Sequence, residues 1–107
     1  MIIDIHGHYT TAPPQLRDWR NKQIADFKPG VPFTDTFTIT DDEIIETITN
    51  GQLKLQKDRG TDVALFSPTA GGMAHHYGDA ATSLQWTRTV NDLIKRVCDL
   101  FPDNFIP

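Results

Sequence analysis

Short apolar runs alternate along this chain with longer segments that have helical periodicity. The runs are rich in Ile, Val, Leu and Phe and predict strands at residues 2–6, 63–66 and 105–106. Apolar positions three or four residues apart predict helices at residues 13–27, 40–59 and 80–101. We expect the first strand to be buried and the second to be covered on both faces. This order indicates an α/β fold of parallel βα units with the helices outside the sheet.

Several residues mark where these helices begin and end. Thr40 and Glu43 have the spacing of a capping box, in which a hydroxyl and a carboxylate bond to the free backbone N–H groups at a helix start. Asp79 can cap the third helix, and Gly60 suits the end of the second. Gly51 lies inside the second helix and weakens it by about 1 kcal/mol relative to alanine. We still predict one continuous helix there.

The composition is that of one modest globular domain. The chain has 107 residues, of which 38% are hydrophobic and 22% are charged, so intrinsic disorder is disfavoured. No apolar run approaches the ~18 residues that a membrane-spanning helix needs, so we expect no membrane partner. The net charge of −4 argues against a nucleic-acid partner, because proteins that bind nucleic acid present basic surfaces.

The cysteine content and the first residues bear on the compartment. Cys98 is the only cysteine, so no disulfide can form within the chain, and a reducing compartment is the simplest expectation. The apolar neighbours of Cys98 indicate a core residue rather than a nucleophile. Asp4 follows the first residues at once, without the basic and apolar regions of a signal peptide. We therefore expect a cytoplasmic protein.

The strongest chemical signal is His6-Gly7-His8 at the carboxyl end of the first predicted strand. Side chains two residues apart in a strand point to the same face, so both imidazoles can bind one ion. Neutral imidazole is a preferred ligand of zinc, with a Zn–N distance of about 2.0–2.1 Å. Asp4 has the same parity and can orient one of these ligands through a hydrogen bond. The alternatives are two histidines with ordinary hydrogen bonds and a satisfied interior carboxylate.

These residues resemble the opening of the amidohydrolase superfamily, in the branch of metal-dependent decarboxylases and hydratases similar to aminocarboxymuconate semialdehyde decarboxylase. More narrowly, the chain resembles the family of 4-oxalomesaconate hydratases. The resemblance covers nearly the whole chain and rests on the motifs His6-Gly7-His8-Tyr9, Asp18-Trp19-Arg20, Thr40-Asp41-Asp42-Glu43, Phe66-Ser67-Pro68, Met73-Ala74-His75-His76, Gly78-Asp79, Trp86 and Leu100-Phe101-Pro102-Asp103-Asn104-Phe105.

The resemblance implies a metal-dependent (β/α)8 TIM barrel, of which residues 1–107 form the N-terminal part, about the first two and a half βα units. It implies one metal, zinc or another divalent ion, with His6 and His8 as the first two ligands. The implied reaction is hydration of an unsaturated oxo-tricarboxylate, a small-molecule carboxylate substrate, in bacterial breakdown of aromatic compounds. The remaining ligands and the catalytic acid and base are then expected beyond Pro107, so the chain looks truncated. Assembly into a homo-oligomer is left open.

Three further residues are candidates for the substrate pocket. Ser67 lies at the end of the second predicted strand, and His75 and His76 lie in the loop that follows it. Loops after barrel strands reach over the active site, and histidine titrates near neutral pH. The alternatives are a hydroxyl that caps the turn at Pro68 and loop histidines that bond to backbone or solvent.

Thr69 departs from the pattern of the hydratases, which have arginine at this position. An arginine would pair with a polyanionic substrate, and threonine cannot supply that charge. This departure favours a second hypothesis, in which the same barrel and metal catalyse decarboxylation or hydrolysis of a small carboxylic acid. A third hypothesis is an inactive fragment.

Overall fold

The computed structural model describes residues 1–107 without a gap, and its three strands form one parallel sheet in the order β1-β2-β3. Along the chain the elements are β1 (Ile3–His8), α1 (Pro14–Ala25), α2 (Asp41–Asn50), α3 (Gln52–Arg59), β2 (Val63–Ser67), the short 3-10 helix η1 (Ala70–Met73), α4 (Ala80–Leu100) and β3 (Phe105–Ile106). The predicted order of strands and helices is confirmed, and so is the parallel pairing. None of the helices is both long and apolar enough to cross a membrane.

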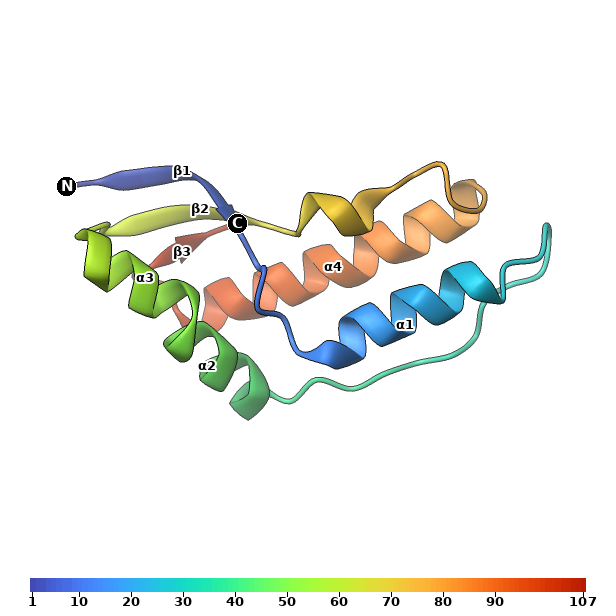
Figure 1. The fold of residues 1–107 in the computed structure, drawn as a ribbon, viewed down its shortest axis with the longest axis horizontal. Helices are drawn as coiled ribbons and strands as arrows, with labels where there is room; N and C mark the ends of the chain where they lie inside the picture. The colour runs from blue at the N-terminus through green and yellow to red at the C-terminus, as the bar shows by residue number, and fades with distance from the viewer.

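The molecule is elongated, with extents of 48 × 25 × 18 Å, and the sheet lies at one end of it (Figure 1). The helices α2 and α3 lie at the sheet end, and α4 begins far from the sheet and runs back along β2 and β3. The helix α1 lies beside the part of α4 that extends past the sheet. There Trp19 of α1 stacks on Trp86 of α4, with ring centroids 6.2 Å apart.

The main hydrophobic core lies between the sheet and the helices. Ala64, Phe66 and Phe105 are buried on the sheet side, and Phe66 and Phe105 have ring centroids 4.6 Å apart. Two side chains of α4, Ile94 and Val97, are buried in the same cluster. The amphipathic pattern of the last helix therefore predicted correctly which side of α4 is buried.

The opposite face of the sheet is bare, so the expectation of a buried first strand and of a second strand covered on both faces is wrong for this chain. Ile5 is 77% exposed and Leu65 is 41% exposed. Alternation places Leu65 opposite the buried Ala64 and Phe66. The reason is that helices pack on one face only, and β1 is an edge strand with a partner on one side.

The predicted capping residues are confirmed, and one predicted helix is corrected. Thr40 and Glu43 form the capping box, in which the Thr40 N–H donates to the Glu43 carboxylate at 2.8 Å. Gly60 ends α3 in the left-handed conformation with φ 69°, and Asp79 accepts from the backbone of the first turn of α4. The continuous helix over residues 40–59 is wrong, because Gly51 leaves the helical conformation with φ −108° and ψ −102° and separates α2 from α3.

Candidate metal and substrate site

The carboxyl ends of β1 and β2 meet at one edge of the sheet, and the histidine motif lies there. His8 is aligned with Ser67 in the parallel register, and Gly7 is aligned with Phe66. The imidazole rings of His6 and His8 are neighbours, with centroids 4.7 Å apart and planes at 86°. The end of β1 therefore places side by side the two side chains that the sequence predicted as metal ligands.

The hydrogen bonds of His8 define its tautomer. Its Nδ1 atom lies 2.9 Å from the carbonyl oxygen of Pro68 and 2.8 Å from Oγ of Ser67. The carbonyl can only accept, and the Ser67 hydroxyl hydrogen is donated to the carbonyl oxygen of Gly7 at 3.0 Å. Nδ1 must therefore carry the hydrogen in both contacts. The lone pair of the neutral ring lies on Nε2, which is the arrangement of a histidine that binds a metal and donates its other N–H to the protein.

Ser67 contacts the ring of His8, and its contact with substrate stays a prediction. Its hydroxyl links Gly7 on β1 to the ring of His8, and this link holds the two strand ends together. The sequence predicted that Ser67 lies at this edge of the sheet and contacts the substrate. The structure gives its hydroxyl two intramolecular partners.

The donors present fit part of a zinc site. Two neighbouring imidazoles, one with its Nε2 lone pair free, suit a zinc ion chemically. A tetrahedral zinc ion in a catalytic site needs at least three protein ligands, and no third His, Cys, Asp or Glu joins these two. Two imidazoles alone do not complete such a coordination.

Asp4 has a different partner from the one expected. Its Oδ1 atom accepts the backbone N–H of His6 at 2.9 Å, and the carboxylate forms no hydrogen bond with either imidazole. The strict alternation assumed for Asp4 and His8 is broken by a bulge, because β1 advances three positions from Asp4 to Gly7 while β2 advances two, from Ala64 to Phe66. The bulge places Asp4 and His8 out of phase in the sheet.

Gly7 is needed where it lies. A Cβ atom on it would be 2.8 Å from the carbonyl oxygen of Leu65 and 3.2 Å from the ring of Phe66. The absence of a side chain lets β1 approach β2 closely between the two histidines. The motif therefore contains its glycine for a packing reason.

Next to this edge lies a cavity of about 480 Å³. It begins at Tyr9 and Pro68, the residues that follow β1 and β2, and is bounded by α1, the loop after β2 and α4. The carbonyl of Pro68 that bonds to His8 thus belongs to a residue of the cavity wall. Thr69 also lines it and donates from Oγ1 to the carbonyl oxygen of Tyr9 at 3.1 Å. The loop after β2 thus forms part of the cavity wall at this end of the sheet.

Tyr9 is buried and its hydroxyl is occupied. The hydroxyl lies 2.7 Å from Oγ1 of Thr47 on α2, and burial raises the pKa of Tyr9 above its ordinary value. The phenol therefore stays protonated at neutral pH and joins the strand end to the helix layer.

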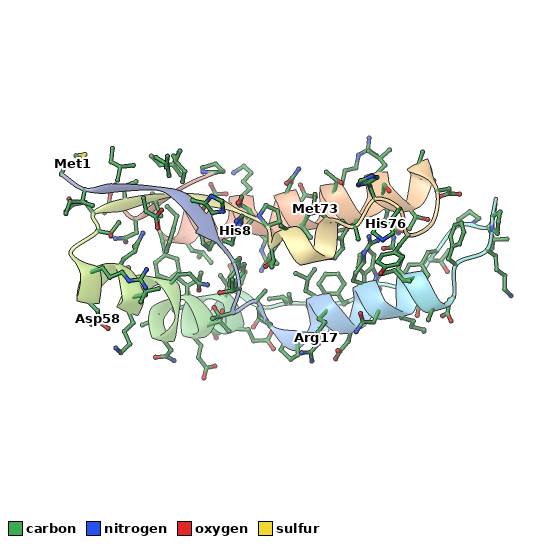
Figure 2. The ribbon with its side chains drawn as sticks, turned by 45° about the horizontal axis from the view of Figure 1, so that its top comes forward. Met1, His8, Arg17, Asp58, Met73 and His76 are labelled. Carbon is green, nitrogen blue, oxygen red and sulfur yellow. The ribbon has the colours of Figure 1, made fainter.

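His75 and His76 lie in an exposed part of the loop and do not line the cavity. Figure 2 shows His8 where β1 ends and His76 farther along, beside the beginning of α4. The rings of His75 and His76 have centroids 6.0 Å apart. The structure does not bring these two residues to the metal ligands, and their contact with substrate stays a prediction.

Arg20 is the residue of this region that reasoning from the sequence did not single out. It is 4% exposed and lines the cavity from α1, and its guanidinium carbon lies 4.8 Å from the ring centroid of Trp86. Burial lowers the pKa of Arg20 from its ordinary value. The signal in the sequence was its place in Asp18-Trp19-Arg20, one of the motifs that carried the family resemblance.

Comparison with known proteins gives two informative matches. No model of a known protein family matches the chain. The 2-keto-4-carboxy-3-hexenedioate hydratase of Sphingobium sp. (strain NBRC 103272 / SYK-6) is 50% identical over 105 residues, which are 98% of this chain and 31% of that protein. The crystal structure of 4-oxalomesaconate hydratase from Rhodopseudomonas palustris superposes with a TM-score of 0.86 at 49% identity, over 99% of this chain and 31% of that one.

The chain thus spans about a third of the length of the relatives that it matches. Over that span the backbone agrees closely with a solved hydratase, and half of the residues are identical. The resemblance that the motifs indicated is confirmed: along nearly its whole length, this chain is similar to hydratases named for 2-keto-4-carboxy-3-hexenedioate and 4-oxalomesaconate.

Proposed function

We propose that this chain contributes the first βα units of a metal-dependent (β/α)8 barrel that hydrates an unsaturated oxo-tricarboxylate. The observation that carries the proposal is 50% identity over 105 residues to a hydratase. The parallel sheet with helices on one face supports it, because a barrel wall has this construction. The bare face of the sheet is the one that would face the interior of such a barrel.

The metal of the proposed enzyme is zinc, held in part by His6 and His8. Zinc supplies a Lewis acid that polarises a substrate oxygen or activates water. His8 keeps its Nε2 lone pair available because Ser67 and Pro68 take up the hydrogen on Nδ1. Gly7 lets the two ligands sit on a strand that lies close against β2. We assign no side chain of this chain as the general acid or base.

The substrate of the proposed enzyme is a small carboxylate. The addition of water to this substrate is a step in the breakdown of aromatic compounds. A cytoplasmic location and assembly with further copies of the protein remain predictions. They follow from the single cysteine and from the general tendency of enzymes to form symmetric oligomers.

The test is a hydration assay with the protein translated from the complete reading frame that contains this chain. We expect the ultraviolet absorbance of 4-oxalomesaconate to fall in the presence of zinc as the double bond is hydrated. His8→Ala should abolish this activity, while Lys54→Ala, on the exposed surface of α3, should retain it. Full activity in a variant that lacks both His6 and His8 would contradict a metal mechanism at this site.

A second candidate reaction is decarboxylation of a small carboxylic acid, and Thr69 favours it. Threonine at this position of the cavity wall adds no positive charge for a tricarboxylate. The same preparation should therefore be assayed for release of carbon dioxide. Carbon dioxide without hydration would replace the first proposal with the second.

A further inference from the structure

The cavity beside the histidine motif carries positive charge on its wall and no negative charge. Arg17 and Arg20 line it from successive turns of α1, and no Asp or Glu lines it. Arg17 is exposed and lies 3.5 Å from the carboxylate of Asp18. Arg20 is buried and forms no ion pair. A buried charge without an opposite charge is unfavourable, so this arrangement needs an explanation.

The partners of Arg20 leave one edge of its guanidinium poorly bonded. Nη1 donates to Oε1 of Gln23 at 2.8 Å, which is a good hydrogen bond. Nη2 has only a long contact of 3.4 Å with the carbonyl oxygen of Ala74, and the buried Nε has no partner. Nε and Nη2 form the edge that presents two parallel N–H groups, which is the geometry that binds both oxygens of a carboxylate.

The rest of the wall suits a carbon skeleton rather than a bare inorganic ion. Ile24 of α1 and Val90, Leu93 and Ile94 of α4 contribute apolar surface to the cavity. With a volume of about 480 Å³, the cavity lies within the size range of small-molecule sites. A ligand with a carboxylate at one end and a carbon chain at the other matches a wall that is charged at Arg20 and apolar elsewhere.

We propose that the cavity binds an organic polycarboxylate, and that the Nε–Nη2 edge of Arg20 pairs with one of its carboxylates. The Ala74 carbonyl gives way to the ligand, because its contact with Nη2 is long. The guanidinium of Arg20 packs over the ring face of Trp86, which supports it. That the ligand is a polycarboxylate rests on the proposed hydratase function. The site itself rests on the unpaired buried arginine.

The loop after β2, residues 68–79, contains no Lys or Arg. Arg20 supplies a guanidinium to the wall of the same cavity from α1. We infer that this chain recognises the negative charge of its ligand from the helix side.

The test uses tricarballylate, a saturated tricarboxylate, added to the purified protein in the presence of EDTA. Isothermal titration gives its affinity, and the ¹⁵N–¹H resonance of Arg20 Nε reports contact at the guanidinium. Tricarballylamide, which has the same carbon skeleton without charge, and inorganic phosphate serve as parallel ligands. Because no metal is present, the measurement does not depend on His6, His8 or hydration.

We expect tricarballylate to shift the Arg20 Nε resonance, and to bind at least tenfold more tightly than the amide or phosphate. Arg20→Gln should weaken this binding by about tenfold or more, as loss of a charge-assisted hydrogen bond would. Arg20→Lys keeps the charge but not the two parallel donors. Its affinity for tricarballylate should lie between that of the unsubstituted protein and that of Arg20→Gln. Arg88→Gln removes an exposed arginine outside the cavity and should bind as the unsubstituted protein does.

Equal binding by the folded Arg20→Gln variant would overturn the proposal, as would phosphate binding that matches tricarballylate. Where Arg20→Gln does not fold, the resonance of the unsubstituted protein decides, because an arginine with a purely structural role would not respond to the ligand. If tricarballylate does not bind at Arg20, the outcome of the hydration assay is unaffected. Conversely, binding at Arg20 without hydration would reject the proposed reaction and retain the site.

Discussion

The hydroxyl oxygen of Ser67 on β2 lies 2.8 Å from Nδ1 of His8 on β1. This contact joins the ends of two strands that are separated by three helices in the sequence. It requires the hydrogen of the His8 ring to be on Nδ1, since the Ser67 hydroxyl hydrogen is donated to Gly7. Removing the Ser67 hydroxyl should loosen the orientation of the His8 ring without removing its Nε2 atom.

Ser67→Ala is expected to weaken zinc binding by about tenfold or more, because the loss of a group that orients a ligand has effects of about 10- to 100-fold. The measurement is a competition titration with a chromogenic chelator. Ser83→Ala on α4 provides the control, since Ser83 lies away from the histidine motif. Unchanged zinc affinity in Ser67→Ala would show that Pro68 alone holds the ring.

The chain itself should bind zinc weakly, with a dissociation constant above about 1 μM, because two imidazoles leave a tetrahedral ion short of protein ligands. His6→Ala and His8→Ala should each reduce this binding further. Equilibrium dialysis at neutral pH measures it. Sub-micromolar binding by the 107-residue chain would mean that other donors complete the coordination.

Gly7→Ala should destabilise the fold by about 1–3 kcal/mol, the range for overpacking a tight contact. Its Cβ would lie 2.8 Å from the backbone oxygen of Leu65, which cannot move without shifting β2. Gly71→Ala is the matched control, because a Cβ there meets nothing within 4 Å. Urea denaturation followed by circular dichroism gives both free energies of unfolding. Equal values for the two variants would contradict the packing explanation.

Gly51→Ala should also destabilise the protein, although alanine favours helix formation by about 1 kcal/mol over glycine. A Cβ at this position would lie 2.8 Å from the carbonyl oxygen of Thr47 and 2.9 Å from the side chain of Thr11. Asn50→Ala, at the exposed end of α2, adds no Cβ atom and tests helix propensity alone. A more stable Gly51→Ala protein would indicate that α2 and α3 can join into one helix.

Glu43 should make the stability of the protein depend on acid pH. Its carboxylate accepts from the Thr40 backbone N–H and from Gln15, and these bonds lower the pKa of Glu43 below its ordinary 4.5. The unfolded state therefore binds the proton more readily than the folded state. The contribution is fully present above about pH 5 and is lost as the pH falls through the lowered pKa of the folded state.

The measurement is the free energy of unfolding of the unsubstituted protein and of Glu43→Gln between pH 2 and pH 7. The difference between the two should shrink as the solution becomes more acidic. Glu46→Gln, on the same helix but outside the capping box, is the matched control for removal of a carboxylate. A difference that stays constant with pH would exclude the charge of Glu43 as its origin.

Local features of this protein could be predicted from its sequence because they depend on residues close together in the chain. The capping box of Thr40 and Glu43 and the left-handed Gly60 satisfy backbone groups within a few residues of themselves. The positions of the strands and the parallel order follow from the spacing of apolar runs. The two histidines of His6-Gly7-His8 lie together because they are two residues apart at the end of one strand.

Other features depend on contacts between segments far apart in the sequence, and only the tertiary structure decides them. The bare face of the sheet reflects which helices are present to cover it, and no residue of β1 or β2 encodes that. At the break between α2 and α3, Gly51 lies so close to Thr11, forty residues earlier, that a Cβ atom would come within 2.9 Å of its side chain. Arg20 looks like an ordinary helix residue until α4 and the loop after β2 bury it beside a cavity. Burial and neighbouring charge are properties of the packed chain, and they turn this arginine into a candidate ligand site.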